Sequence, residues 1–352
     1  MDIELFDYDL PEELIAQSPM EQRDQCRLMV IDREHHTFEH KRFHDILDYL
    51  KPGDVLVRNN TKVIPARLLG VKVETKGAVE VLLLKQLEND TWECLVGNAK
   101  SVKVGSHCSF GNGELTCTCV GVKPEGLRDM QFHYQGIFME VLERLGEMPL
   151  PPYIKKQCSN NDDYQTVYAK IPGSAAAPTA GFHFTKELFQ EIRAKGVQVE
   201  EITLNIGLGT FRPVKVKDTK DHVMHSEIIE MDETTAKELN QAKAEGRRII
   251  AIGTTSVRTL ESIYQKYGRF QATREATRLY IEPGYQYLSV DAMITNFHLP
   301  KSTLLELVSA FAGRSFTLAC YQEAVNQRYR FFSFGDAMFI YGKHQNSPAD
   351  KE

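Results

Sequence analysis

The sequence predicts an α/β protein, in which a small antiparallel β-barrel is inserted into a larger mixed α/β domain. Helix and strand patterns alternate from residue 185 onward, as is typical of a domain built on a parallel sheet. Residues 71–135 instead hold only short β-rich runs separated by turn residues. The 352 residues suffice for two domains. We place the α/β domain at residues 1–68 and 151–352 and the barrel at residues 69–150.

Six β-rich runs make up the inserted block, and six strands at this spacing are typical of a small barrel or sandwich. The runs are VKVET, AVEVLLLKQL, TWECLVG, SVKVGSHCSF, ELTCTCVGVK and LRDMQFHY. Cys117 and Cys119 lie two apart and would point to one face of a strand. Packed cysteines are favoured over zinc, because a C-x-x-C knuckle or histidine pair is missing and only His107 lies near. We therefore expect no metal site.

The α/β part begins again after EMPLPPYI, whose prolines mark the return crossing. A helix is expected from the N-cap Thr185 to Gly196, followed by the strand VQVEEITLNIG, in which Glu200 and Glu201 interrupt the apolar run. A helix that ends at Gly246, the strand RRIIAIG and a helix from about residue 256 come next. This alternation predicts a parallel core.

Composition excludes several classes of protein. A net charge of −6 argues against a sequence-blind nucleic-acid coat but leaves room for a specific RNA held by a local basic patch. Runs of charged residues are also typical of a solvent-exposed face, so each candidate has this second interpretation. The candidates for the patch are Lys155, Lys156, Arg212, Lys215, Lys217, Lys220, Arg247 and Arg248. No apolar window is long enough to span a membrane, and the start of the chain is acidic. Seven cysteines, an odd set without an export signal, indicate reduced thiols. We expect a cytoplasmic protein with no membrane partner.

The segment RRIIAIGTTSVRTLESI reads as a buried strand, a glycine turn and a helix N-terminus. Such a junction presents free backbone N–H groups and the positive end of a helix dipole to an anion. Gly253, Thr254 and Thr255 lie at the turn, and Arg258 can reach it from the first helical turn. An ordinary β–α junction with a hydroxyl N-cap explains the same residues equally well.

LNIGLGTFRPV resembles a dinucleotide-binding fingerprint but lacks its third glycine. Pro213 stands where the binding helix should begin, so we exclude a Rossmann cofactor site. Gly207, Gly209, Thr210 and Arg212 still describe a loop at the carboxyl end of a strand, where ligands of open α/β sheets bind.

Three histidines, His183, His225 and His298, stand beside these loops among small or polar residues. Each could be a structural histidine, but three together favour a site with general acid or base groups. Glu227 adds a carboxylate close to His225. Before His183 comes a run of small residues, GSAAAPTAGF, which lets a backbone or flat ligand approach closely.

The same loops, in order, resemble one family, the S-adenosylmethionine:tRNA ribosyltransferase-isomerases of queuosine biosynthesis. The resemblance runs nearly end to end and is carried by FDYDLPEELIAQSP, RDQCRLMVID, GDVLVRNNTKVIPARLLG, YQTVYAKIPGSAAAPTAGFHFT, LNIGLGTFRPV, HVMHSE, AIGTTSVRTLES, TNFHLPKSTLLELVSAFAG and RFFSFGDAMFIYG. Two departures are REATRLYIEPGY, where the family often has Gly-x-Thr before PGY, and GSAAAPT, where GSVAAPT is commoner.

The resemblance implies an α/β domain with an inserted barrel and a specific reaction. The ribosyl group of S-adenosylmethionine passes to 7-aminomethyl-7-deazaguanine (preQ1) at the wobble position of a tRNA and is isomerised, giving epoxyqueuosine while adenine and methionine leave. S-adenosylmethionine is then a consumed cosubstrate, so no resident cofactor is expected. We expect a monomer with this tRNA and S-adenosylmethionine as partners.

Site residues follow from these loops. We expect His183, His225 and His298 to carry proton transfers, with His183 beside the reacting groups, and Glu227 or an aromatic face to balance the sulfonium charge. Phe182 and Phe184 could stack a base or belong to the core. Expected substrate contacts are Arg67, Thr179, Gly181, Phe184, Thr185, Gly207, Gly209, Thr210, Arg212, Gly253, Thr254, Thr255, Arg258 and Asn296.

Two other function classes fit less well. A methyltransferase would carry a glycine-rich loop after its first strand and an acidic residue at the end of the next strand, and neither is present. A non-catalytic tRNA-binding module would favour a basic chain over one with a pI near 6.0.

Overall fold

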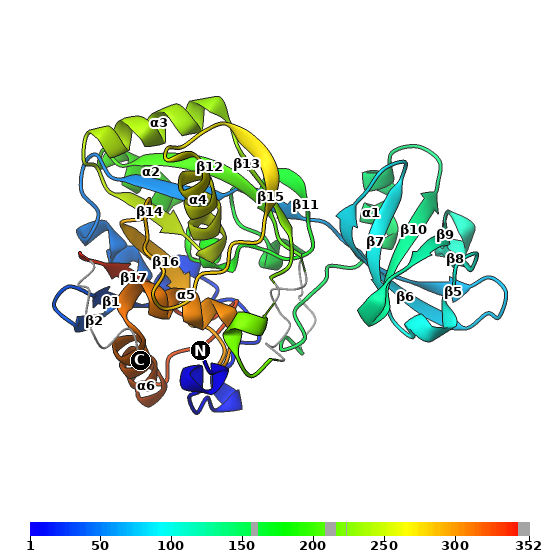
Figure 1. Ribbon diagram of the computed structural model, residues 1–352, viewed down its shortest axis with the longest axis horizontal. Helices are drawn as coiled ribbons and strands as arrows, with labels where there is room; N and C mark the ends of the chain where they lie inside the picture. The colour runs from blue at the N-terminus through cyan, green and yellow to red at the C-terminus, as the bar shows by residue number, and fades with distance from the viewer. Residues whose placement is uncertain (156–160, 208–215, 223, 344–352) are drawn as a thin grey trace.

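A computed structural model describes residues 1–155, 161–207, 216–222 and 224–343. Figure 1 shows a larger body of helices and strands with a smaller barrel standing beside it, joined by two crossing segments. The predicted fold class, a mixed α/β domain with an inserted antiparallel barrel, is confirmed. None of the helices in these described ranges is long and apolar enough to cross a membrane.

The larger body is built on a nine-stranded sheet in the described part of the chain. Its order is β15 (Thr273–Thr277), β13 (Glu227–Met231), β12 (Gln198–Asn205), β3 (Val55–Asn59), β14 (Ile249–Ile252), β16 (Ala292–Asn296), β17 (Ala337–Tyr341), β1 (Arg27–Asp32) and β2 (Thr37–Arg42). The four central strands β12, β3, β14 and β16 run parallel. Their carboxyl ends therefore share one edge of the sheet.

Helices cover both faces of this sheet, so its central strands read as continuous apolar runs. Along β3, Val55 and Val57 face one core cluster while Leu56 faces the other. The first cluster includes residues of α3 (Glu233–Ala244), α4 (Thr254–Tyr267), α5 (Thr303–Ala312) and α6 (Arg314–Asn326). The second includes residues of α2 (Lys186–Ala194) and the 3₁₀ helix η4 (Phe43–Asp48).

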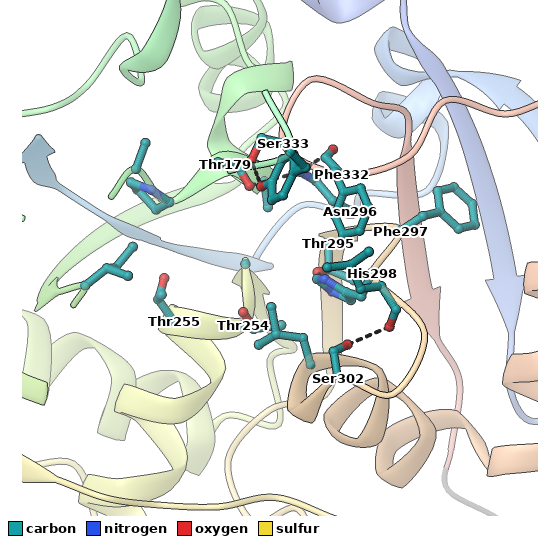
Figure 2. A pocket seen from close by; sticks show the side chains of 18 residues that line it. Thr179, Thr254, Thr255, Thr295, Asn296, Phe297, His298, Ser302, Phe332 and Ser333 are labelled. Atoms are coloured by element: carbon teal, nitrogen blue, oxygen red, sulfur yellow. Dashed lines mark hydrogen bonds between the residues drawn. The ribbon is translucent and has the colours of Figure 1, made fainter. Parts of the chain in front are cut away.

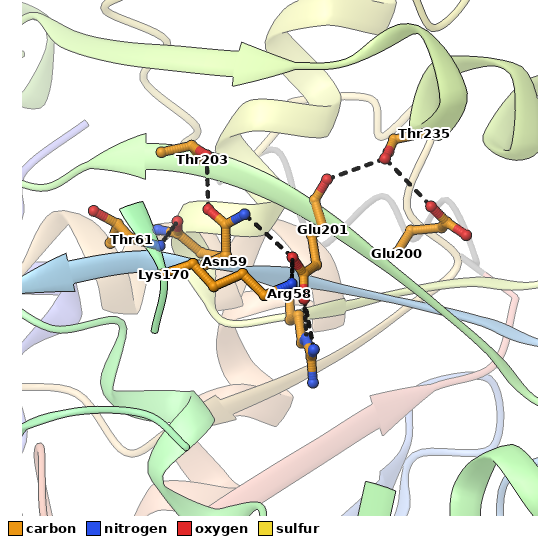
Figure 3. A network of polar contacts seen from close by, with 9 residues as sticks. Arg58, Asn59, Thr61, Lys170, Glu200, Glu201, Thr203 and Thr235 are labelled. Atoms are coloured by element: carbon orange, nitrogen blue, oxygen red, sulfur yellow. Dashed lines mark hydrogen bonds and ion pairs between the residues drawn. The ribbon is translucent and has the colours of Figure 1, made fainter. Parts of the chain in front are cut away.

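The two glutamates that interrupt β12 belong to a polar network between strands (Figure 3). Glu201 lies opposite Arg58 on β3 and accepts from its Nε at 3.2 Å and from Lys170 Nζ at 2.7 Å. Glu200 accepts from Thr235 Oγ1 at the start of α3, at 3.2 Å. The interruption is thus explained by cross-strand pairing and helix anchoring.

The barrel closes in the order β10 (Leu127–His133), β7 (Thr91–Val96), β6 (Ala78–Gln86), β5 (Arg67–Lys72), β8 (His107–Phe110) and β9 (Leu115–Val122). Neighbouring strands are antiparallel, so the sandwich alternative is wrong. The helix α1 (Phe138–Leu145) packs against its core. Alternation directs one face of each strand inward, and Cys117 and Cys119 on β9 are both buried there.

Cysteines in the described ranges are all free and buried, as the reduced-thiol prediction requires. Among the described residues, no group of three or more histidine, cysteine or acidic side chains could hold a metal ion. The seventh cysteine, Cys158, lies outside the described residues.

Two segments connect the barrel to the larger body and lie side by side. The N–H of Arg67 donates to the carbonyl of Glu147 at 3.1 Å, and the reverse bond is 2.8 Å. Before this crossing β4 (Thr61–Val63) pairs with β11 (Ile171–Ser174), which leads into the small-residue stretch. This pairing places that stretch at the carboxyl edge of the large sheet, beside the end of β3.

Candidate functional site

A cavity of about 710 Å³, which we call the first cavity, lies at the carboxyl ends of the parallel strands (Figure 2). Ligands of open α/β sheets bind at this edge. Three strand ends supply one side, and the small-residue stretch and the segment after α6 supply the other. Its lining residues are Tyr153, Ala177, Pro178, Thr179, Ala180, Ile206, Gly253, Thr254, Thr255, Thr295, Asn296, Phe297, His298, Leu299, Ser302, Leu304, Phe332 and Ser333.

The N-terminus of α4 forms one wall of the first cavity. Gly253 has φ +85°, which glycine adopts without strain, so the helix begins at Thr254 rather than near residue 256. No side chain caps this end, and Gly253, Thr254 and Thr255 all line the cavity. Buried Asn59, at the end of β3, donates from Nδ2 to Thr255 Oγ1 at 3.2 Å and fixes that hydroxyl. The junction thus presents N–H groups and hydroxyls to the cavity.

His298 is the one imidazole among the described residues that line the first cavity. Its Nε2 lies 2.9 Å from Thr295 Oγ1, and its backbone N–H donates to Tyr321 Oη at 3.0 Å. Burial lowers the pKa of His298 to about 3, because the charged form is poorly solvated. The ring is therefore neutral near pH 7, with Thr295 holding its Nε2 and Tyr321 holding the backbone of the same residue.

Asn296 and the imidazole of His183 form a chain of hydrogen bonds. Asn296 Nδ2 donates to Thr179 Oγ1 at 3.0 Å and to the carbonyl of Phe332 at 3.2 Å, so its Oδ1 faces His183 Nε2 at 2.6 Å. Nε2 of His183 must then carry the proton. Nδ1 is left to accept from Cys26 Sγ, 3.1 Å away.

His183 does not line the first cavity, contrary to the expectation that it lies beside the reacting groups. Its ring is 3 % exposed, and burial lowers its pKa to about 4. Cys26 is also buried, and burial raises the pKa of its thiol, so this Cys–His–Asn chain lacks an accessible nucleophile. A hydrogen bond to Asn296 links the His183 ring to a residue that lines the cavity.

Three more expected contacts belong to packing. Phe184 is fully buried and stacks on Phe189 with ring centroids 4.8 Å apart. A Cβ on Gly181 would meet Tyr168 Oη at 2.0 Å, so the glycine is required by a ring and not by a ligand. Thr185 is the N-cap of α2, as predicted, and its Oγ1 accepts from the N–H of Leu188 at 3.0 Å. None of the three lines a cavity described here.

Phe182 likewise belongs to a core cluster, where it packs with Tyr164 and Phe334. The small residues before it have a divided role. Ala177 and Ala180 line the first cavity, and the Ala180 Cβ lies 3.4 Å from where a Cβ on Gly253 would stand. The stretch therefore gives clearance to a cavity and allows close packing behind it.

An aromatic pair that sequence reasoning missed completes the first cavity. Tyr153 and Phe332 stack with centroids 4.6 Å apart and both line it. Phe332 has φ +70°, a strained conformation for a bulky residue, and such strain concentrates at functional sites. The string RFFSFGDAMFIYG carries the residue but gives no sign of this conformation or of its partner.

The second cavity adjoins the first, because Leu304 lines both. It measures about 520 Å³ and is lined by His222, Met224, His225, Glu227, Arg258, Leu279, Tyr280, Ile281, Thr303, Leu304 and Leu307. The structure thus brings together His225, Glu227 and Arg258, as expected from the sequence, but in a compartment distinct from that of His298. His222 and Tyr280 were not anticipated.

Charge in the second cavity centres on one buried ion pair. Arg258 Nη1 donates to Glu227 Oε2, and its Nε donates to the carbonyl of Leu279 at 3.1 Å. Its Nη2 is buried and has no hydrogen-bond partner among the described residues. Burial, and the neighbouring His225, lower the pKa of His222. Tyr280 Oη donates to Glu306, whose pKa is raised to about 7 by burial.

Arg67 lies outside both cavities. Its Nε donates to Glu80 Oε1 at 2.7 Å and its Nη1 to Glu147 Oε2 at 3.0 Å, so it fastens the start of the barrel to the return crossing. Arg247 and Arg248, proposed for a basic patch, instead bond to Gln198 and Asp54 among the sheet strands.

The loop after β12 is only partly described. Gly207 is half-buried, and its neighbour Ile206 lines the first cavity. Gly209, Thr210 and Arg212 lie outside the described residues.

The sequence and the fold are similar to those of one family of known proteins. The family model described as "queuosine biosynthesis protein" matches residues 3–340. The chain belongs to this family. It is 56 % identical over 340 residues, 97 % of this chain and 100 % of the relative, to the S-adenosylmethionine:tRNA ribosyltransferase-isomerase of Staphylococcus haemolyticus. The crystal structure of the S-adenosylmethionine tRNA ribosyltransferase of Thermotoga maritima superposes with a TM-score of 0.56, at 38 % identity, covering 96 % of this chain and 99 % of that one.

The resemblance seen in the loop sequences is therefore confirmed, and the chain is an enzyme of the ribosyltransferase-isomerase class. The loops that carry the resemblance meet in space. GSAAAPTAGFHFT, AIGTTSVRTLES, TNFHLPKS and RFFSFGD supply walls of the first cavity, and four residues of HVMHSE line the second, namely His222, Met224, His225 and Glu227.

Proposed function

We propose that this member of the queuosine biosynthesis family transfers the ribosyl moiety of S-adenosylmethionine to preQ1 at the wobble position of a tRNA and isomerises it to epoxyqueuosine, releasing adenine and methionine. The observation that carries the proposal is a first cavity at the carboxyl edge of the sheet that joins a helix N-terminus, six serine and threonine residues, an aromatic pair and one neutral imidazole. S-adenosylmethionine is consumed, so the chain needs no resident cofactor or metal.

The reaction needs a base for the proton on the carbon next to the sulfonium, which the positive sulfur acidifies, and an acid for departing adenine. His298 is the proton acceptor favoured by geometry, because it is neutral and lines the first cavity. His225 is exposed, lines the second cavity and is the second candidate for proton transfer. Glu227 supplies negative charge near the sulfonium. His183 acts as a positioning residue for Asn296.

Stacking and clearance support the nucleoside part of the proposal. The Tyr153 and Phe332 rings offer an aromatic face beside Ala177 and Ala180, whose small side chains leave room for a flat base. An extruded tRNA base must enter such a cavity, since chemistry on a wobble base requires its removal from the stack. We expect the enzyme to work as a cytoplasmic monomer.

The test is incubation of purified enzyme with S-adenosylmethionine and an anticodon stem-loop that carries preQ1. Chromatography measures released adenine, and mass spectrometry identifies the modified RNA. Adenine release matched by epoxyqueuosine is the expected result. Transfer of a methyl group alone would show a methyltransferase, and RNA binding without adenine release would show a binding module. Either result would overturn the proposal.

A further inference from the structure

The second cavity has a chemistry of its own. Its walls are apolar at Met224, Leu279, Ile281 and Leu307, yet it contains a carboxylate and a guanidinium. That combination suits a ligand with an apolar stem that ends in both a positive and a negative group. A purely apolar ligand would form no favourable contact with the ion pair, and a purely anionic ligand would be repelled by the carboxylate.

Arg258 supplies the observation that points to a ligand. The residue is 6 % exposed, and Nε and Nη1 are already bonded to protein acceptors, so the guanidinium plane is fixed. Nη2 is buried and finds no acceptor in the part of the chain that the structure describes. Burying a charged N–H without a partner costs free energy that a bound anion would recover. The two N–H groups of Nη2 fit a carboxylate.

The position of the second cavity narrows the choice of ligand further. Leu304, at the start of α5, lines both cavities, so a molecule that fills the first can extend into the second. S-adenosylmethionine has this shape: a nucleoside at one end, a sulfonium in the middle and an amino acid on a two-carbon stem.

We infer that the second cavity binds the α-amino-acid end of S-adenosylmethionine, with its carboxylate on Arg258 Nη2 and its α-ammonium beside Glu227. This inference rests on the proposed function. The adenosyl group then lies in the first cavity, the sulfonium lies near Leu304, and the leaving methionine remains held by Arg258 after bond cleavage. The subsite accounts for Glu227 and Arg258 standing apart from His298.

Isothermal titration calorimetry with three ligands tests the subsite. S-adenosylmethionine carries the full amino acid, decarboxylated S-adenosylmethionine lacks the carboxylate, and 5′-methylthioadenosine lacks the whole amino-acid end. We expect the wild type to bind S-adenosylmethionine about 10- to 100-fold more tightly than the decarboxylated compound, the range of a charged hydrogen bond. In Arg258→Gln this preference falls below about threefold while 5′-methylthioadenosine binds as before.

Two further variants keep the test decisive. Arg258→Lys preserves the positive charge next to Glu227 but loses the planar fork, so it should fold and still lose most of the carboxylate preference. Arg274→Gln is the matched control, because Arg274 also pairs with a strand glutamate, Glu230, but on the surface. Its three affinities should equal those of the wild type.

Each contrary outcome has a distinct meaning. A wild type that binds all three ligands alike would overturn the subsite and leave the proposed function standing. Equal loss of all three ligands in both Arg258 variants would assign Arg258 to structure and also overturn the subsite. Weaker binding of the stem-loop alone would make Arg258 a phosphate contact instead. A wild type that binds none of the three would overturn both the subsite and the proposed function.

Discussion

The two adjoining cavities differ in charge. Described residues lining the first include no aspartate, glutamate, lysine or arginine, and its polar groups are hydroxyls, an amide, an imidazole and helix N–H groups. The second contains Glu227, Arg258 and two histidines. A neutral compartment suits a nucleoside and keeps His298 unprotonated, while an ionic one suits a zwitterion. In the proposed function the two compartments recognise the two ends of one substrate, and Leu304 lines both of them.

The largest expected effect comes from removing the imidazole of the neutral compartment. His298→Gln should lower turnover about 100- to 10 000-fold, the contribution of a positioned acid or base, while binding of S-adenosylmethionine changes only a few-fold. Single-turnover adenine release measures it. His35→Gln is the control, because this histidine side chain is 71 % exposed on the surface. Turnover within tenfold of the wild type in His298→Gln would remove His298 from the chemistry.

A substitution in the ionic compartment, the second cavity, should lower the stability of the protein. Arg258→Met removes the guanidinium of the buried Arg258–Glu227 ion pair and should lower the free energy of unfolding by about 3–5 kcal/mol. The pair Arg274–Glu230, at 3.5 Å with side chains 73 % and 51 % exposed, provides the comparison. Arg274→Met should cost less than about 1 kcal/mol. Urea unfolding measures both, and equal costs would mean that burial of the Arg258 pair is unimportant.

Acid should lower the free energy of unfolding through His183, which is buried behind the first cavity. The folded-state pKa of His183, about 4, lies below its ordinary value of 6.5, so the unfolded chain takes up the proton first. Stability is full above pH 6.5 and is lost as pH falls toward 4, by about 3 kcal/mol from this residue. His298 acts in the same direction.

Substitution of His183 separates this effect from catalysis. His183→Gln can still donate to Asn296 Oδ1, so it should flatten the acid loss of stability and keep turnover within about tenfold. His183→Ala leaves Asn296 Oδ1 unpaired and should reduce turnover further. Unfolding at several pH values and adenine release measure the two. Turnover in His183→Gln as low as in His183→Ala would return His183 to a direct chemical role.

The smallest expected effect concerns the helix N-terminus. Thr255→Val removes the hydroxyl that accepts from Asn59 Nδ2 and should weaken binding of 5′-methylthioadenosine about fivefold, roughly 1 kcal/mol. Thr255→Ser, which keeps the hydroxyl, should bind as the wild type does. If the Thr255→Val variant binds 5′-methylthioadenosine as tightly as the wild type, the N–H groups of α4 and not its hydroxyls hold the nucleoside.

Local pattern was sufficient for most of the fold. Runs of alternating residues between turn signals gave six barrel strands, because inward and outward positions alternate along a strand, but the first strand, β5, begins at Arg67 and not at Val71. The alternation of helix and strand patterns gave the parallel core, because a helix that connects two strands brings them side by side in the same direction. The start of α4 was misplaced by two residues, because the backbone freedom of Gly253 is a local conformation that periodicity does not reveal.

The site was predicted less completely. Gly181 and Phe184 stood in a loop with the right composition, yet their neighbours Tyr168 and Phe189 determine their role. Tyr153 and Phe332 are nearly 180 residues apart in sequence and meet only in the folded chain. Which side of a loop faces a cavity depends on packing partners distant in sequence.

The sequence by itself determined the family, the α/β class with its barrel, and the loops that form the site, because these follow from residue order and from periodicities of two and 3.6. Only the tertiary structure divided those loops into two cavities, buried His183 behind Asn296 and left Arg258 Nη2 unpaired. These outcomes depend on burial and on contacts between distant segments, which set pKa values and hydrogen-bond partners once the chain has packed.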